Sequence, residues 1–269
     1  MGDSLRAAIL GIVEGLTEFL PVSSTGHMIL AMPLLGVDGA SDPWPSFLYF
    51  IQIGAIFAVI LYFLPALVRQ IATRPAGGVG DHLLTKLLVA MAPSAVIGLS
   101  FDDVAEKYLE RPVPVAAALI VGGGVMIWIE RRYRKTTGPS IEQVTLRQAF
   151  FVGLAQCVAI IPGTSRAMAT IMGGLVVGMP GATAAEFSFY LAIPTLCGAG
   201  LLRIVKHREA LTGDHLETMA VGFMLSFLVA WAVVAAFMKY IRTRPLWPFA
   251  VYRIGLGVVV LAWLALRAG

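Results

Sequence analysis

The sequence predicts an all-α polytopic membrane protein with about six transmembrane helices and two re-entrant helical hairpins. Composition is the first observation behind this prediction. Of the 269 residues, 58% are hydrophobic and 13% are charged, roughly half of the ~25% charged residues in soluble domains. Mean hydropathy is +0.82. The two cysteines do not predict a disulfide framework.

Apolar segments of spanning length are the second observation. A transmembrane helix needs about 20 consecutive, mostly apolar residues. Six segments meet this requirement, and several have basic or aromatic residues at their ends, as interfacial anchors do. They are Trp44–Leu67, Leu83–Ser100, Pro112–Ile129, Glu186–Ile204, Glu217–Tyr240 and Trp247–Leu266.

Two interrupted apolar regions, Leu5–Leu35 and Leu146–Met179, are the third observation. Each is too long for one span and is broken in the middle by proline and small polar residues. The halves of about 14 residues favour re-entrant or interfacial helices over spans. A non-helical break at membrane depth is tolerated only where protein buries it or where it lines a wet cavity. We therefore expect two helical hairpins.

The two hairpins resemble each other in sequence. Gly11–Glu14 in the first corresponds to Gly153–Gln156 in the second, and Leu20–Ser24 corresponds to Ile161–Ser165. Three spans separate the hairpins, so they would enter from opposite faces, as in an inverted-topology repeat. We expect a single membrane domain over residues 1–269, with repeat halves 1–130 and 131–269. The site would lie near the midplane, where the broken elements meet.

The positive charge is best explained by membrane orientation. The net charge of +4 could suggest nucleic acid, but we expect no nucleic-acid partner. Eleven lysines and arginines lie on the side of loops 68–82, 130–147 and 241–246, against seven on the other side. Basic residues gather on the cytoplasmic side, which predicts that those three loops are cytoplasmic.

Two carboxylates interrupt the first apolar region. Glu14 and Glu18 are four residues apart, so they share one helix face, with Thr17 beside them. Charged groups inside a membrane protein are costly and usually functional. Hard oxygen ligands suit Mg²⁺ or Ca²⁺, so both are candidate catalytic residues and metal ligands. The alternative is a polar pair that shares one proton or reaches toward the membrane surface.

The break that follows carries hydroxyls and a histidine. Pro21 is expected to end the first half-helix, and Ser23, Ser24 and Thr25 are good N-caps for the second. Free amides at a helix N-terminus bind phosphate. His27 could act as acid, base or nucleophile. The alternative is plain capping, with His27 as a core histidine.

The second break repeats this pattern and adds a fixed charge. Thr164 and Ser165 follow Pro162-Gly163, and Arg166 matches phosphate geometry with paired donors. Arg166 could also serve only to neutralise Glu14 or Glu18. The remaining candidate substrate-binding residues are Thr170, one turn further, and Gln156, the counterpart of Glu14. Together these residues describe a phosphate or diphosphate site with a divalent cation, for a substrate that carries a lipid tail.

Some polar residues have weaker functional signals. Arg253 lies inside the last span and needs a partner that the sequence does not identify. Glu186 and Ser188 open a span and fit an interfacial position. The Gly122–Gly124 run allows close helix packing and is no phosphate loop, because no lysine follows at the right spacing.

The first broken region resembles the signature of the undecaprenyl-diphosphate phosphatase family of the bacitracin-resistance type. The matching residues are Glu14–His27, which read EGLTEFLPVSSTGH, and Pro162–Arg166 is similar to its second signature. Glu186–Phe189 and Ala192–Pro194 also resemble that family. One departure is Ala167-Met168, where the family usually has Ser-Gly.

The resemblance implies an inner-membrane enzyme that removes one phosphate from undecaprenyl diphosphate and so recycles the lipid carrier of cell-wall synthesis. It implies a divalent cation, membrane lipids around the protein and a site facing the periplasm. Glu14 and Glu18 would bind the metal or aid proton transfer. Ser24 would be nucleophile or phosphate ligand, and His27 base or nucleophile. Ser165 and Arg166 would bind the diphosphate.

Three points stay open at this stage. A lipid phosphatase with a histidine nucleophile would need a second histidine after the Ser-Arg pair, and only His207 and His215 follow, in a loop. An inverted-repeat transporter or flippase for undecaprenyl phosphate or another anion is the main alternative function. The oligomeric state is also open, with a homodimer as one possibility.

Overall fold

The computed structural model describes residues 2–39, 44–72, 78–109, 111–206 and 216–268, and within them it is helical, with no strand. This confirms the all-α class. These ranges form two 3₁₀-helices, η1 (Val79–Asp81) and η2 (Cys157–Ile160), and ten α-helices. These are α1 (Asp3–Thr17), α2 (Ser24–Leu34), α3 (Trp44–Ala72), α4 (Leu83–Leu109), α5 (Pro112–Tyr133), α6 (Leu146–Gln156), α7 (Arg166–Val176), α8 (Gly181–Lys206), α9 (Leu216–Ile241) and α10 (Trp247–Ala268).

Four helices in this part of the chain are long and apolar enough to cross a membrane, namely α3, α5, α9 and α10 up to Leu266. The protein is therefore a multi-pass membrane protein. The other two predicted spans also form long helices, α4 and α8, but neither is among the four. The apolar part of α4, Leu83–Gly98, counts as a shorter apolar helix. The predicted count of six is thus confirmed only for four.

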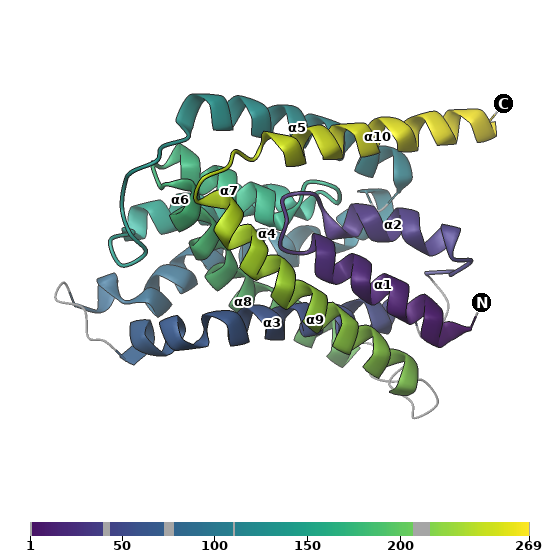
Figure 1. Cartoon of the computed structure of the whole chain (residues 1–269), viewed down its shortest axis with the longest axis horizontal. Helices are drawn as coiled ribbons and strands as arrows, with labels where there is room; N and C mark the ends of the chain where they lie inside the picture. Colours follow the sequence, from purple (N-terminus) through teal and green to yellow (C-terminus); the bar gives the residue numbers. More distant parts are fainter. Residues whose placement is uncertain (1, 40–43, 73–77, 110, 207–215, 269) are drawn as a thin grey trace.

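The order of helices repeats along the chain. A short helix, a break and a second short helix come first in each half, and three long helices follow. The short helices α1 and α2 lie on one side of the molecule and α6 and α7 on the other (Figure 1), and their breaks face the space between them. The third long helices of the two halves, α5 and α10, pack side by side along one edge.

The packing contacts of the two short N-terminal helices correspond. α1 packs on α9, and α6 packs on α4. A Cβ atom on Gly11 would overlap the carbonyl oxygen of Gly222 in α9, and one on Gly153 would overlap that of Ala90 in α4. Gly11 and Gly153 are the residues paired in the sequence comparison. Each of these glycines brings its helix into direct backbone contact with the fourth helix of the opposite half of the chain.

The predicted close packing along the glycine run is present at two of its three positions. A Cβ on Gly123 would lie 2.9 Å from the Ala250 carbonyl oxygen of α10. On Gly122 it would lie 2.6 Å from Nη2 of Arg253. Among the described residues, no atom of a neighbouring segment lies within 4 Å of a Cβ placed on Gly124. The contact between α5 and α10 therefore depends on the first two glycines, which let α10 pack closely against α5.

Candidate active site

Both breaks are built around a serine with an unusual backbone conformation. Ser23 caps α2 at φ 73° and Ser165 caps α7 at φ 76°, the only two non-glycine residues with positive φ in the part of the chain that the structure describes. Each hydroxyl accepts a hydrogen bond from the amide three residues on, Gly26 or Met168. Such strain costs about 1–3 kcal/mol and is concentrated at functional sites.

The prediction of N-caps is therefore confirmed at Ser23 and Ser165, while the end of the first half-helix differs slightly from expectation. α1 ends at Thr17, four residues before Pro21, and Glu18 is its C-cap. The reason is local: proline has no N–H, so Pro21 cannot donate to the Thr17 carbonyl and the helix cannot continue. Glu18 thus lies at the helix end, facing the break.

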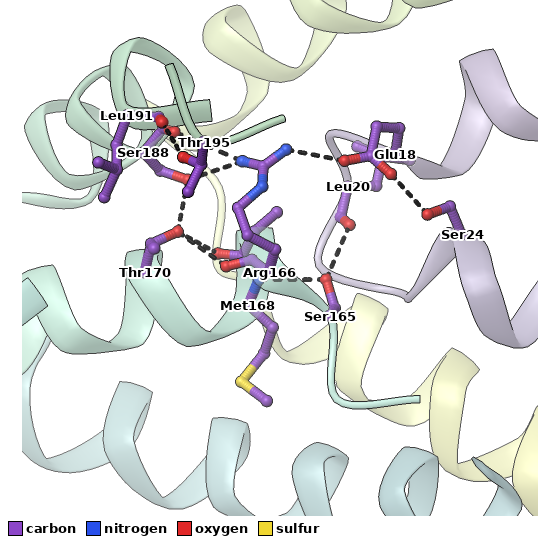
Figure 2. Close-up of polar contacts among 11 residues, drawn as sticks. Glu18, Leu20, Ser24, Ser165, Arg166, Met168, Thr170, Ser188, Leu191 and Thr195 are labelled. Carbon is purple, nitrogen blue, oxygen red and sulfur yellow. Dashed lines mark hydrogen bonds and ion pairs between the residues drawn. The ribbon is translucent and has the colours of Figure 1, made fainter. Parts of the chain in front are cut away.

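An ion pair joins the two breaks. Nη2 of Arg166 lies 2.9 Å from Oε1 of Glu18; the Glu18 side chain is buried and that of Arg166 is 11% exposed. The hydroxyl of Ser24 donates to Oε2 of the same carboxylate at 2.5 Å. Figure 2 shows Arg166 and Ser24 pointing at Glu18 from two different segments. The guanidinium also lies 5.4 Å from the centre of the Phe19 ring.

Arg166 is held from behind by α8. Its Nη1 donates to the carbonyl and hydroxyl oxygens of Ser188 at 3.4 and 3.5 Å. The hydroxyls of Thr170 and Ser188 are 2.6 Å apart, and Thr170 also donates to the Arg166 carbonyl (Figure 2). Ser188 is fully buried, and α8 begins at Gly181, five residues before the predicted span. Thr170 and Ser188 therefore orient Arg166.

A cavity of about 180 Å³ lies at this junction. Six of the sequence-predicted site residues line it: Glu18, Ser23, Ser24, Thr25, Ser165 and Arg166. The sequence did not single out three other lining residues, Gln52 of α3, Ala159 of η2 and Leu196 of α8. A glutamine within an apolar span was the available signal for Gln52.

Backbone donors without backbone acceptors also lie at this junction. The first amides of α2 and α7 find no backbone acceptor among the described residues, as is usual at helix N-termini. Nε of Arg166 is buried and has no hydrogen-bond partner within the same ranges. Two sets of free amides and one unsatisfied guanidinium donor thus surround the cavity. This is the donor arrangement that a phosphate group requires.

The other predicted site residues lie outside the cavity lining. His27 points toward α10: its Nδ1 donates to the Ser23 carbonyl at 2.7 Å, and its Nε2 lies 2.8 Å from the Tyr252 hydroxyl. Gln156 donates to Ser94 of α4 at 2.6 Å. Thr164 is buried, and its carbonyl faces Arg253. The structure therefore brings six predicted residues together and places these three beside the site.

Glu14 is buried one turn before Glu18, in electrostatic range of Glu18 and Arg166. Within the described ranges, no hydrogen bond or ion pair engages its carboxylate, and no group of three or more His, Cys, Asp or Glu side chains forms a metal cluster. Mg²⁺ is commonly held by one or two carboxylates, with substrate phosphates and water completing the shell. Glu14 and Glu18 fit such a site.

Comparison with known proteins agrees with this geometry. The family model described as Bacitracin resistance protein BacA matches residues 7–259. The undecaprenyl-diphosphatase of Albidiferax ferrireducens is 45% identical over 96% of this chain and 94% of the relative. That of Novosphingobium aromaticivorans is 45% identical over 99% and 100%. Undecaprenyl-diphosphatase 2 of Rhodospirillum rubrum is 46% identical over 96% and 94%.

Proposed function

The chain belongs to the BacA family of bacitracin resistance proteins, and from this premise we propose that it hydrolyses undecaprenyl diphosphate to undecaprenyl phosphate and inorganic phosphate. The product is the lipid carrier of peptidoglycan synthesis, which the enzyme recycles. The observation that carries the proposal is the chain of contacts from Arg166 through Glu18 to Ser24 at the wall of one polar cavity.

The diphosphate binds at the paired helix N-termini. Arg166 and the first amides of α2 and α7 donate hydrogen bonds to the phosphate oxygens, because free N–H groups and helix dipoles favour negative charge there. Ser23, Thr25 and Ser165 complete the wall of the cavity. Thr164, Thr170 and Gln156 lie outside this wall and support the binding residues from there. The prenyl tail extends into the membrane lipids.

Glu18 is the general base of the reaction. It accepts a proton from the attacking hydroxyl, either that of Ser24, 2.5 Å away, or a water in the cavity. The attacking oxygen forms a bond to the terminal phosphorus, and the bond from that phosphorus to the bridging oxygen breaks. Undecaprenyl phosphate leaves with the bridging oxygen. In the serine route, water then hydrolyses the phosphoserine. A positioned base contributes ~10²–10⁴-fold to such a rate.

Glu14 and Glu18 would hold the divalent cation, Mg²⁺ or Ca²⁺. When bound, the cation supplies positive charge that stabilises the phosphoryl oxygens. Removal of divalent cations with EDTA is expected to stop turnover, and added Mg²⁺ or Ca²⁺ to restore it. Glu14→Gln should raise the cation concentration needed for half-maximal rate, while Glu217→Gln, which removes an exposed carboxylate, should not. Equal cation dependence in both variants would contradict the assignment.

We propose that the membrane arrangement is an inverted repeat, with α1–α2 and α6–α7 as re-entrant hairpins and α4 and α8 as the remaining spans. The corresponding packing of Gly11 and Gly153 supports it. We further propose that the protein resides in the inner membrane with the cavity facing the periplasm, and that it assembles as a homodimer. Labelling of single-cysteine variants in intact cells tests the orientation, and light scattering in detergent tests the dimer.

Phosphate release decides between hydrolysis and transport. Purified protein in detergent, given a polyprenyl diphosphate and Mg²⁺, is expected to release phosphate, and Glu18→Gln to lose at least 100-fold in kcat, on the scale of general-base losses. Thr17→Val is the matched control, because the Thr17 hydroxyl donates to the Val13 carbonyl of its own helix at 2.7 Å. No release from the wild type across several lipids and metals would overturn the proposal in favour of a transporter.

A further inference from the structure

Arg253 is a charged residue that the proposed reaction does not use. It lies in α10, its side chain is fully buried, and it is among the largest buried side chains of the described residues. No carboxylate forms an ion pair with it there. Its guanidinium instead donates hydrogen bonds to five backbone carbonyls, which are those of Pro21, Ala118, Leu119, Gly163 and Thr164.

These five carbonyls belong to three separate parts of the chain. Pro21 lies in the first break, and Gly163 and Thr164 lie in the second. Ala118 and Leu119 belong to α5, which packs against α10. The shortest bonds, 2.7 and 2.9 Å from Nη2, go to the second break. One side chain therefore connects both breaks to the pair of helices α5 and α10.

The bonds to Arg253 also fix the direction of an amide. In a trans peptide, the carbonyl of one residue and the N–H of the next point to opposite sides. Because the Thr164 carbonyl points at Arg253, the N–H of Ser165 points away from it. This N–H has no backbone acceptor among the described residues, and Ser165 lines the cavity. By its bond to the Thr164 carbonyl, Arg253 thus keeps the free N–H of Ser165, at the start of α7, directed away from the guanidinium.

The charge of Arg253 has a second effect. A guanidinium stays protonated in proteins, and here its partners are neutral carbonyls, so its positive charge is not cancelled by a carboxylate. A buried charge acts over a longer range than an exposed one, because the surroundings screen it poorly. The charge lies directly behind the breaks that wall the cavity. It therefore favours anions in the cavity without touching them.

We propose that Arg253 is a positioning residue for the phosphatase reaction, which holds the two breaks at a fixed separation and adds positive charge behind the phosphate site. This inference rests on the proposed function, since it concerns the same cavity. It assigns no bond between Arg253 and the substrate. It predicts that displacement of the guanidinium lowers kcat even when Arg253 itself is unchanged.

Gly122 offers a way to displace the guanidinium. A Cβ on Gly122 would lie 2.6 Å from Nη2 of Arg253, so Gly122→Ala must push this group away from its carbonyls. Gly124→Ala is the matched control, since it makes the same change two residues further along α5 where no atom lies within 4 Å. The two variants differ only in what the added methyl group meets.

The experiment compares Gly122→Ala, Gly124→Ala, Arg253→Lys and Arg253→Gln in detergent, with kcat, KM and the unfolding temperature measured for each. Gly122→Ala is expected to lose at least 10-fold in kcat and Gly124→Ala less than 2-fold. Arg253→Lys should retain more activity than Arg253→Gln, because it keeps the charge and some of the donors. The proposal is overturned by equal kcat in the two glycine variants, or by Lys and Gln variants of equal kcat.

Binding of inorganic pyrophosphate, measured by calorimetry, separates this proposal from the proposed function. If the wild type binds pyrophosphate but releases no phosphate from lipid, the proposed function fails. Weaker pyrophosphate binding by Gly122→Ala than by Gly124→Ala would then still support the role of Arg253. Equal binding by the two variants would contradict it. If the Arg253 variants do not fold, the comparison of Gly122→Ala with Gly124→Ala tests the proposal without them.

Discussion

Arg166 and Glu18, which are 148 positions apart in the chain, meet in a largely buried ion pair with Nη2 and Oε1 2.9 Å apart. The pair connects the first residue of α7 to the C-cap of α1. Neither half of the chain therefore contains the site alone. Glu18 also accepts a hydrogen bond from the Ser24 hydroxyl. A change at Arg166 therefore affects both the proposed base, Glu18, and the proposed nucleophile, Ser24.

Arg166→Lys is expected to lower kcat by about 10²-fold or more, because a lysine cannot reproduce the paired, planar donors of a guanidinium. Arg166→Gln should be worse, and it should also lower the unfolding temperature, since removing one partner of a buried ion pair costs about 3–5 kcal/mol. Steady-state phosphate release and thermal unfolding measure the two effects. A lysine variant with wild-type kcat would remove Arg166 from the reaction.

His27 is expected to act through Ser23. Its Nδ1 donates to the Ser23 carbonyl, so it supports the strained cap of α2, and its other nitrogen is turned to Tyr252 of α10. Asparagine can also donate an amide hydrogen to that carbonyl. We therefore expect His27→Asn to retain at least 10-fold more activity than His27→Ala, and Tyr252→Phe to lose less than either. Equal inactivity of the two His27 variants would restore its role as acid, base or nucleophile.

The caps and breaks of this site could be predicted from the sequence because they are local. Proline has no N–H to continue a helix, and serine hydroxyls cap the next one, so Pro21, Ser23 and Ser165 already indicate the two breaks. The partners of His27 and Arg253 could not be predicted this way. These partners depend on how α10 packs against the breaks. Tyr252, the partner of His27 in α10, lies more than 200 residues from it in the sequence.

The same distinction explains the helices. Apolar composition identifies α3, α5, α9 and α10, because length and hydropathy are local properties. For Ser188, apolar composition did not suffice to predict its position in the fold. The sequence indicated no partner for this residue, whereas the structure buries Ser188 in α8 in contact with Arg166. Which polar residue faces the site depends on the rotation of α8, which packing with α7 determines.

Gly11 and Gly153 are predicted to be sensitive to alanine. An added methyl group would overlap a backbone carbonyl on α9 or α4, and backbone cannot move as easily as a side chain. Overpacking of this kind costs about 1–3 kcal/mol. Gly198→Ala is the control, with no atom within 4 Å of its Cβ, and helix propensity favours alanine there. Thermal unfolding in detergent should rank both variants below this control, and the opposite order would contradict the packing described.

Glu142, in the loop between α5 and α6, is predicted to make stability depend on pH. Burial acts to raise the pKa of its carboxyl, but hydrogen bonds from Ser140 and Gln70 and the charge of Arg69 outweigh this and leave the pKa below its usual 4.5. A lowered pKa in the folded state stabilises the protein above the unfolded value. The stabilisation is lost as the pH falls below about 4.5 and through the folded pKa.

The unfolding temperature of the wild type should therefore fall more steeply between about pH 5 and pH 3 than that of Glu142→Gln, which has no carboxyl to protonate. Ser140→Ala should lie between the two, since it removes one bond, of 2.8 Å, to the carboxylate. High salt should reduce the difference, because Arg69 and Glu142 are exposed and 3.7 Å apart. Parallel pH profiles for the wild type and Glu142→Gln would show that this carboxyl does not link pH to stability.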